Sequence, residues 1–580
     1  MRFPIIFLFT AVFLLFTVVN CTSNDSQPTN STESSESPES TYSRVYRSLE
    51  QALKNPEDVY VLNLENGELS ELSSEIGKLV NLTTLKLEDN NLTELPDEIW
   101  QLTNLVYLDL DNNSITKISS EIGNLINLQE LDLDNNQLDT IPPLIGQLIK
   151  LTSLDLSDNK LKELPTQIGN LRKLVELKLF DNELIKLPAE IGNLTGLTEL
   201  QLKNNELDSL PPEIGNLVNL NYINVAFNNL KELPSEIGRL TKLTVLITRS
   251  NQLTTFPPEI GNLVNLNYIN STFCDLKELP SEIGNLRNLE TLKLSNNLIE
   301  SLPEEFGNLS ELTSLELFHN KLKSLPESIG NLSGLSALEL YDNELETIPA
   351  SIGDMTGLYT LLLDSNRLTT LPPEIGKLEN LYRLSLWKNQ LTNLPREIGH
   401  LTNLDKLILE ENHLTSLPST FINLKNLFEL ELDSNKFTEV PPEVLKLTQL
   451  MKLDMEKNQV SVIPLGIMEL SELVYLDFEK NNISVIPAEI GSLWQLEFLS
   501  LGGNRIRSIP PELGQLMNLE NLGLENNPIR ILPETIMDCM RLSTLNLDGT
   551  NISANEKRLW EYWTSNHQSQ FNSEWDEYGD

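Results

Sequence analysis

The sequence is poor in the side chains that build most catalytic and metal sites. Three cysteines and four histidines occur in 580 residues, and they form no cluster along the chain. A zinc site needs cysteine and histidine ligands that converge at close spacing. The sequence also lacks a Gly-Lys phosphate-binding loop and a Gly-x-Ser-x-Gly nucleophile motif. These absences predict a protein that is not an enzyme, with no catalytic residues, no such metal site and no organic cofactor.

Basic residues are scarce as well. The 42 Lys and Arg residues stand against 84 Asp and Glu residues, which gives a formal net charge of −42. This charge argues against a nucleic-acid partner and against direct binding to anionic lipid headgroups. It favours a basic partner, a bound cation, or solubility alone. Since 580 residues exceed what one compact core usually holds, the chain should form several domains or a repeat array.

Only one long apolar run occurs, within residues 1–20, which we interpret as a signal peptide. Cys21 follows this run, and the segment resembles a bacterial lipoprotein signal, although Asn20 departs from the usual small residue before the cysteine. The resemblance implies that Cys21 carries a lipid anchor and that the chain meets a membrane only there. Residues 21–41 are rich in Ser and Thr and predict a disordered tether. The alternatives are secretion without a lipid and an uncleaved membrane anchor.

A 23-residue repeat dominates the rest of the chain. Residues 82–92 follow the pattern LxxLxLxxNxL, and its asparagine returns every 23 residues from Asn90 to Asn527. This gives 20 units in strict register, 19 with Asn and one with Cys274. One degenerate unit lies on either side, so residues 59–552 hold 22 units. A unit cannot bury its leucines alone, so the units should stack into a solenoid.

This pattern resembles the leucine-rich repeat family. The stretches "SLEQALKNPEDVYVLNL" and "LPPEIGNLVNL" are similar to spirochaetal, leptospiral-type lipoproteins and exported proteins, and also to the Ras-group scaffolds. The resemblance implies an α/β solenoid, a curved horseshoe with a parallel β-sheet on the concave face and short helical or 3-10 turns on the convex face. It further implies that the asparagine side chains form a ladder of hydrogen bonds to adjacent turns.

Both ends of a solenoid need a cap, because a bare end exposes leucines and an open sheet edge. Residues 42–58 predict an N-terminal capping helix, with Val45, Leu49, Ala52 and Leu53 on one face. Residues 553–580 form a C-terminal cap and an aromatic-rich tail, in which we expect Leu559, Trp560 and Trp563 to cover the last unit.

Aromatic side chains make up only 6% of the chain, yet many of them fall on outward positions of the middle units. Exposed aromatics on a concave sheet are favoured anchors at interfaces. The alternative is that they stack on one another and only stiffen the sheet. We expect them to bind a protein or peptide, with a glycan as the weaker candidate, and they are Phe180, Tyr222, Phe227, Tyr268, Phe273, Phe318, Tyr341, Tyr359, Tyr382 and Trp387.

The early units carry an acidic patch instead. Asp109, Asp132 and Asp155 share one column, Glu130 lies beside them, and Lys86 is the only cation expected near them. Stacked carboxylates repel one another, so this patch predicts a basic partner, a Ca²⁺ ion, or a solvated acidic surface.

Residues 269–276 read "INSTFCDL" and nearly repeat "INVAFNNL" at residues 223–230, two units earlier. Cys274 therefore replaces a ladder asparagine, and Thr248 and Ser271 replace inward leucines. We expect this stretch to be the weakest part of the core.

The sequence as a whole predicts a monomeric, non-enzymatic binding module, exported to the outer membrane or cell surface as a lipoprotein, or secreted. Its partner would be a protein or peptide, host-derived or basic, in an adhesin role. The alternative is a periplasmic or intracellular-type scaffold with a structural or signalling role.

Overall fold

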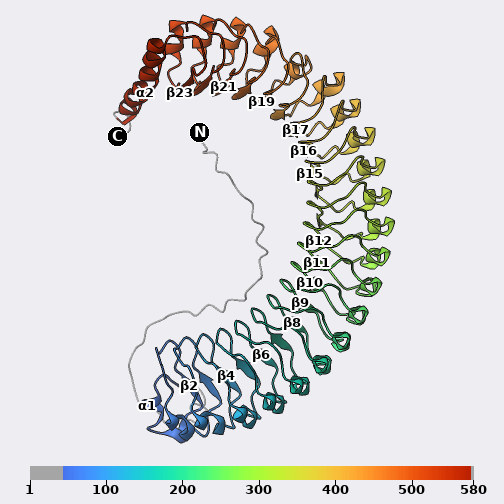
Figure 1. Ribbon diagram of the computed structural model, residues 1–580, viewed down its shortest axis with the longest axis vertical. Helices are drawn as coiled ribbons and strands as arrows, with labels where there is room; N and C mark the ends of the chain where they lie inside the picture. The colour runs from blue at the N-terminus through green and yellow to red at the C-terminus, as the bar shows by residue number, and fades with distance from the viewer. Residues whose placement is uncertain (1–43, 577–580) are drawn as a thin grey trace, which may run out of the picture. The chain divides into compact units, whose positions relative to one another are not determined.

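The computed structural model describes residues 44–576, and their side chains up to residue 565. Cys21, the predicted signal peptide and the predicted tether lie outside the described residues. From Val45 onward the chain is one open, curved solenoid, with its strands on the inner side and its turns on the outer side (Figure 1).

One parallel sheet of 23 strands lines the inner side of the curve. Each strand after β1 is the three-residue centre of one repeat, and each pairs in parallel with the next strand at a register of 23 residues, as Leu85 does with Leu108. The alternation of the strand sends Leu108 into the core and its two neighbours outward. The strands are β1 (Val45–Tyr46), β2 (Val61–Asn63), β3 (Thr84–Lys86), β4 (Tyr107–Asp109), β5 (Glu130–Asp132), β6 (Ser153–Asp155), β7 (Glu176–Lys178), β8 (Glu199–Gln201), β9 (Tyr222–Asn224), β10 (Val245–Ile247), β11 (Tyr268–Asn270), β12 (Thr291–Lys293), β13 (Ser314–Glu316), β14 (Ala337–Glu339), β15 (Thr360–Leu362), β16 (Arg383–Ser385), β17 (Lys406–Ile408), β18 (Glu429–Glu431), β19 (Lys452–Asp454), β20 (Tyr475–Asp477), β21 (Phe498–Ser500), β22 (Asn521–Gly523) and β23 (Thr544–Asn546).

The outer side is built of 3-10 turns, which confirms the horseshoe expected from the repeat. They run from η3 (Ser74–Lys78) to η23 (Glu534–Asp538), mostly with five residues each. A proline with extended backbone usually precedes the turn, as Pro211 does in η9 (Pro212–Asn216). The proline ring fixes φ at about −65° and offers no N–H to the sheet. The glycine of "EIGNL" allows neighbouring turns to approach closely. A Cβ atom on Gly284 would lie 2.2 Å from the carbonyl oxygen of Glu305 in the next unit.

The asparagine column forms the expected ladder between units. Asn136 Oδ1 accepts the backbone N–H of Ile115 at 2.9 Å, and Nδ2 donates to the carbonyl oxygens of Leu110 at 2.9 Å and Leu133 at 3.2 Å. The side chain is buried, and these bonds satisfy backbone groups that the loop after the strand leaves unpaired.

The N-terminal cap differs from the predicted helix over residues 42–58. The helix α1 covers only Leu49–Ala52, a short 3-10 turn η2 covers Pro56–Asp58, and β1 adds a strand whose Tyr46 pairs with Leu62. Val45 is therefore 48% exposed and not on a helical face, while Tyr46 is buried. An extra strand covers the open sheet edge more directly than a helix does.

The C-terminal cap is the helix α2 (Ala554–Asp576), which follows β23 directly. Trp560 is 9% exposed and meets Trp563 edge to face at 5.9 Å, and both pack against the last unit. Leu559 is 67% exposed, so the expectation that it covers the core was wrong. It lies one residue before Trp560 and therefore points to another face of the helix.

The irregular units around residue 271 keep the common fold. Thr248 and Ser271 are fully buried in place of leucine, and their hydroxyl oxygens lie 2.6 Å apart. Cys274 is also buried, and its Sγ donates to the Thr248 carbonyl oxygen at 3.4 Å. Burial raises the pKa of the Cys274 thiol to about 11, so this cysteine is a buried thiol and not a reactive one.

Candidate functional site

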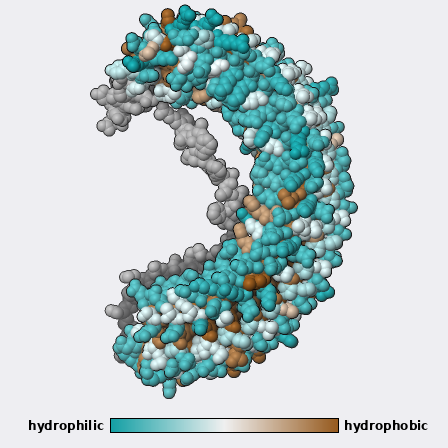
Figure 2. Space-filling model, in the orientation of Figure 1, coloured by the Kyte–Doolittle hydropathy of each residue, from teal (hydrophilic) through white to brown (hydrophobic). Residues whose placement is uncertain are grey.

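The concave face consists of the outward side chains of the strands and of the loop that follows each strand. Its columns are set by the 23-residue period, so equivalent side chains of neighbouring units lie about 4.8 Å apart. Figure 2 shows a largely hydrophilic surface with isolated hydrophobic patches. Two parts of this face differ in chemistry, and we name them the acidic segment (residues 107–159) and the central segment (residues 222–276).

In the acidic segment a lysine closes each end of the aspartate column. Asp109, Asp132 and Asp155 pair in register on β4, β5 and β6. Lys86 Nζ lies 3.9 Å from Asp109 Oδ2, and Lys178 Nζ lies 3.2 Å from Asp155 Oδ2. Lys86 is thus not the only nearby cation, since Lys178 occupies the same column one strand after Asp155. Asp132, in the middle, has no lysine in the ion pairs of the described residues.

The three aspartates also serve the backbone. Asp132 Oδ1 accepts the N–H of Asp134 at 3.0 Å, and Asp155 Oδ1 accepts the N–H of Ser157 at 3.0 Å. Burial, together with the negative charges of Asp155 and Asp109, raises the pKa of Asp132 to about 7. Glu130 lies exposed in the adjacent column. The three aspartates therefore have structural partners in the backbone, and the two end aspartates also lie beside lysines, which Glu88 and Glu176 share.

This arrangement does not form the calcium site considered for the acidic patch. Among the described residues, no three or more His, Cys, Asp or Glu side chains are placed to hold a metal ion. The physical reason is that one oxygen of each column aspartate already accepts a backbone N–H, and the two end carboxylates pair with lysines.

In the central segment, two phenylalanines flank an arginine. The guanidinium carbon of Arg249 lies 5.5 Å from the ring centre of Phe227 and 5.0 Å from that of Phe273. The three residues come from three successive units, so the guanidinium lies between the two rings. Both rings are exposed, at 42% and 49%. Tyr222 and Tyr268 are half-buried on β9 and β11, on either side of β10.

Further along, four more of the predicted aromatics form two stacked pairs. Phe318 and Tyr341 stack with ring centres 4.5 Å apart, and Tyr359 and Tyr382 stack at 4.8 Å. Each of these rings has a stacking partner one unit away, which is the contact that the stacking alternative expected. Phe180 and Trp387 are half-buried on separate units.

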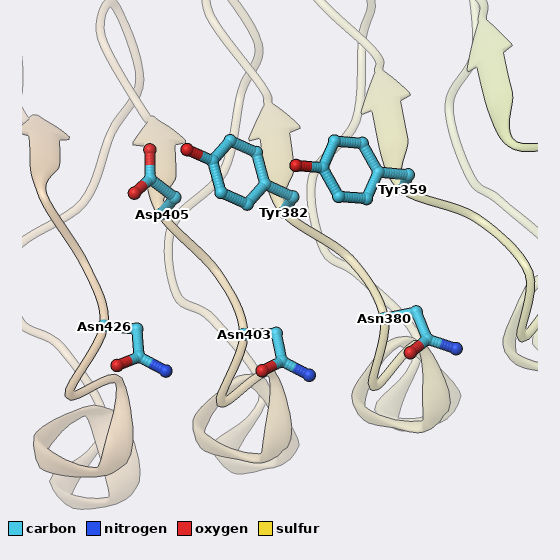
Figure 3. A pocket seen from close by; sticks show the side chains of 6 residues that line it. All are labelled: Tyr359, Asn380, Tyr382, Asn403, Asp405 and Asn426. Atoms are coloured by element: carbon cyan, nitrogen blue, oxygen red, sulfur yellow. The ribbon is translucent and has the colours of Figure 1, made fainter.

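A hollow of about 550 Å³ lies beside the second stacked pair. Figure 3 shows Tyr359, Tyr382 and Asp405 in one row above three asparagines. The asparagine amides donate to backbone carbonyls of the preceding unit, as Asn403 does to Glu379 at 2.9 Å. The nearby Asp405 carboxylate raises the pKa of Tyr382 to about 12. The lower row is thus part of the framework, while the upper row presents two rings and a carboxylate.

Several concave-face features were missed by the sequence analysis. Tyr475 and Phe498 stack at 4.3 Å in the same column as Tyr222 and Tyr268, and His319 meets Phe318 edge to face at 5.4 Å. A second acidic region follows the aromatic units, where burial raises the pKa of Asp433 and Asp454 to about 7. Reading every outward column over the full repeat array would have found all of these. No helix among residues 44–576 combines the length and apolar composition needed to cross a bilayer.

Family models match almost the entire repeat array. The model described as "Leucine-rich repeat region" matches residues 58–135, 116–206, 199–275, 257–321 and 306–407. "Leucine rich repeat" matches residues 379–437 and 448–506, and "Leucine Rich repeats (2 copies)" matches residues 494–535. A search of curated proteins found no match.

Solved structures give the same result. The leucine-rich repeat protein LIC12759 of Leptospira interrogans is 39% identical, with 70% of this chain and 98% of that chain covered and a TM-score of 0.55. The Arabidopsis receptor kinase HAESA, in complex with the peptide hormone IDA and the co-receptor SERK1, is 31% identical, with 86% and 87% covered and a TM-score of 0.60. The plant peptide hormone receptor RGFR1, in complex with RGF2, is 32% identical, with 86% and 91% covered and a TM-score of 0.58.

Scaffolds of this kind are typically non-enzymatic protein-binding modules, which agrees with the exposed aromatic side chains of the concave face. The repeat pattern, the parallel sheet with 3-10 turns and the matches over residues 58–535 lead to one conclusion. The chain belongs to the leucine-rich repeat family and is similar to its leptospiral type.

Proposed function

We propose that this protein is an exported, lipid-anchored surface protein that captures a protein or peptide on the middle of its concave face. The observation that carries the proposal is the run of aromatic groups there, from Tyr222 to Trp387. Exposed rings offer large apolar area and little conformational entropy to lose, which makes them effective contact residues. Plant receptors with 31–32% identity are solved with peptide hormones, which supports a peptide as one class of partner.

The export part of the proposal rests on the apolar run of residues 1–20 and on Cys21. A host protein is the partner we propose for a surface lipoprotein, in an adhesin role. Treating intact cells with protease tests the location, because only a surface protein is cleaved. Full protection would favour the periplasmic scaffold instead. Loss of labelling by radioactive palmitate in Cys21→Ser tests the lipid.

Capture tests the concave face. Alanine at Tyr222, Tyr268, Tyr341 and Trp387 together should abolish partner capture from host extracts, identified by mass spectrometry, without unfolding the chain. The matched control is Trp494→Ala, since Trp494 is an exposed aromatic two residues after the 3-10 turn η21 (Ala488–Ser492) on the outer side. Equal capture by the quadruple variant and the wild type would refute the concave face as the binding surface.

A further inference from the structure

Arg249 is an unusual cation for this molecule. The net charge is −42, and Lys86 and Lys178, which flank the acidic segment on the concave face, are paired with carboxylates. No ion pair joins Arg249 to a carboxylate among residues 44–565, and its Nε is buried without a hydrogen-bond partner. Its described neighbours are the two phenylalanine rings, which hold the guanidinium through cation–π contacts. The charge is thus positioned but not neutralised.

The phenylalanines that hold it are placed at a structural cost. Phe227 has φ 55° and Phe273 has φ 56°, in the left-handed region that bulky residues avoid. Every repeat from Asn66 to Gly549 has positive φ at this column, and most use Asn, Asp, Ser or Gly. A bulky residue in this conformation costs about 1–3 kcal/mol. Strain combined with exposure of an aromatic ring indicates that the side chain is kept for contact and not for stability.

Residues 222–230 and 268–276 are two near-identical segments, and most of their differences lie at buried positions. Between residues 222–230 and 268–276, Tyr, Asn and Phe on the outward positions are the same in both copies. Four positions differ, and three of them are buried positions of the core and the ladder, where Val225, Ala226 and Asn228 correspond to Ser271, Thr272 and Cys274. The fourth change, from Asn229 to Asp275, is not buried. Drift that serves packing alone would preserve the buried residues and change the exposed ones. Both copies thus share the same outward residues. We name Tyr222, Asn224, Phe227, Tyr268, Asn270 and Phe273 the frame.

The frame encloses an apolar floor. Val245 points outward from β10 between Tyr222 and Tyr268, and Ile247 points outward between Asn224 and Asn270. The neighbouring Asn224 and Asn270 accept backbone N–H groups of their own loops at 3.0 Å and 3.2 Å through Oδ1. These residues span two strand spacings, about 10 Å, which is the length of about three extended peptide residues. Together with β10 and Arg249, the frame offers aromatic walls, an apolar floor and one unpaired guanidinium.

We propose that this frame binds a peptide carboxylate that is next to an aromatic or aliphatic side chain, with Arg249 as its anchor. The inference rests on the proposed function and names the chemistry that the central segment recognises. A guanidinium between aromatic faces forms charge-assisted hydrogen bonds to a carboxylate through its terminal nitrogens. The acidic segments on either side repel an acidic ligand, so the site accepts it at one place only. The carboxylate belongs either to an acidic side chain or to a peptide C-terminus.

Saturation-transfer NMR on the full-length chain tests this directly with small probes. N-acetylphenylalanine presents a terminal carboxylate, N-acetylaspartylphenylalaninamide a side-chain carboxylate, and N-acetylphenylalaninamide neither. At millimolar concentration, at least one acid should give a signal that the neutral amide lacks, and comparison of the two acids identifies the source. Arg249→Gln should weaken binding about tenfold, as expected for the loss of one charged hydrogen-bonding partner. Arg383→Gln, an exposed arginine of β16, is the matched control and should leave the signal unchanged.

A second variant separates loss of binding from loss of folding. Phe227→Asn with Phe273→Asn places the column's common residue at both positions, so the chain should melt at a higher temperature and still lose the probe signal. Equal signals from acid and amide, no signal from either acid, or full binding by Arg249→Gln would each overturn the inference. If Arg249→Gln captures the protein partner normally, only this inference fails. If probes bind but the quadruple alanine variant still captures, the proposed concave face fails separately.

Discussion

The acidic segment and the central segment differ in which residues are regular, those of the buried core or those of the concave surface. In the acidic segment the inward leucines and ladder asparagines are regular, and the outward carboxylates accept backbone N–H groups or pair with lysines. In the central segment the core contains Thr248 and Ser271 and the ladder contains Cys274, while the outward aromatics are kept in both copies. Stability in a repeat array is roughly a sum over units and interfaces, so neighbours can sustain a weak unit. This difference is what the proposed function predicts, with regular packing in the acidic segment and contact residues in the central segment.

Replacing a ladder asparagine of the acidic segment by cysteine, as at Cys274, should have the largest effect on stability. Asn136→Cys removes the acceptor for the Ile115 N–H and the donor to the Leu110 carbonyl. Leaving both buried groups unpaired should lower the free energy of local unfolding by about 2–4 kcal/mol. Hydrogen exchange of the Ile115 amide measures it. Protection as high as in the wild type would show that the ladder adds nothing to stability and that the two segments do not differ.

The buried hydroxyl pair gives a second contrast. Ser271→Ala leaves the Thr248 hydroxyl without its partner at 2.6 Å, which should destabilise the chain by about 1–2 kcal/mol in urea unfolding. The double variant Thr248→Val with Ser271→Ala removes both polar groups and should be more stable than the single variant. If the two substitutions instead add, the hydroxyls are not coupled and the central core is no weaker than any other.

Repairing the central ladder should have a smaller effect. Cys274→Asn restores an amide where the thiol makes only weak contacts, at 3.4 Å to the Thr248 carbonyl oxygen and 3.9 Å to that of Thr272. We expect a gain of about 1 kcal/mol in urea unfolding. Partner capture should be unchanged, because Phe273 and Arg249 are untouched. A loss of capture with a gain of stability would mean that the weakness of the central segment itself serves binding.

The fold was predictable because the strict 23-residue period assigns every residue of the array to a fixed position in its unit. The 23-residue register predicted which residues lie in the sheet, and the same register places Lys178 one strand after Asp155. The position of that lysine in the aspartate column follows from the repeat period alone. The short cap helix and the exposure of Leu559 could not be read this way, since the ends break the repeat and depend on contacts that occur once. The placement of Arg249 between Phe227 and Phe273 depends on backbone and side-chain torsion angles, which the sequence pattern does not specify.

The pH dependence of stability gives a further comparison of the segments, and the acidic regions should dominate it. Burial raises the pKa of Asp132 and of Asp454 to about 7, well above the value of about 3.8 for an unperturbed aspartate. Between pH 4 and pH 7 the folded chain therefore binds protons that the unfolded chain has lost, so stability falls as the pH rises through this window and levels off above it. The melting temperature should be higher at pH 5 than at pH 8, by about 3 °C for each such group.

Variants assign this dependence to its source. Asp132→Asn and Asp454→Asn keep the side-chain oxygen that accepts the N–H of Asp134 and of Glu456, but they remove the titration, so each should flatten the pH profile. Asp208→Asn, at an exposed position, is the matched control. Arg249→Gln should leave the slope of melting temperature against pH unchanged between pH 5 and pH 8, because an arginine does not titrate in this range. A steeper profile in Arg249→Gln would connect the two segments electrostatically, and the division between a stability segment and a binding segment would then be wrong.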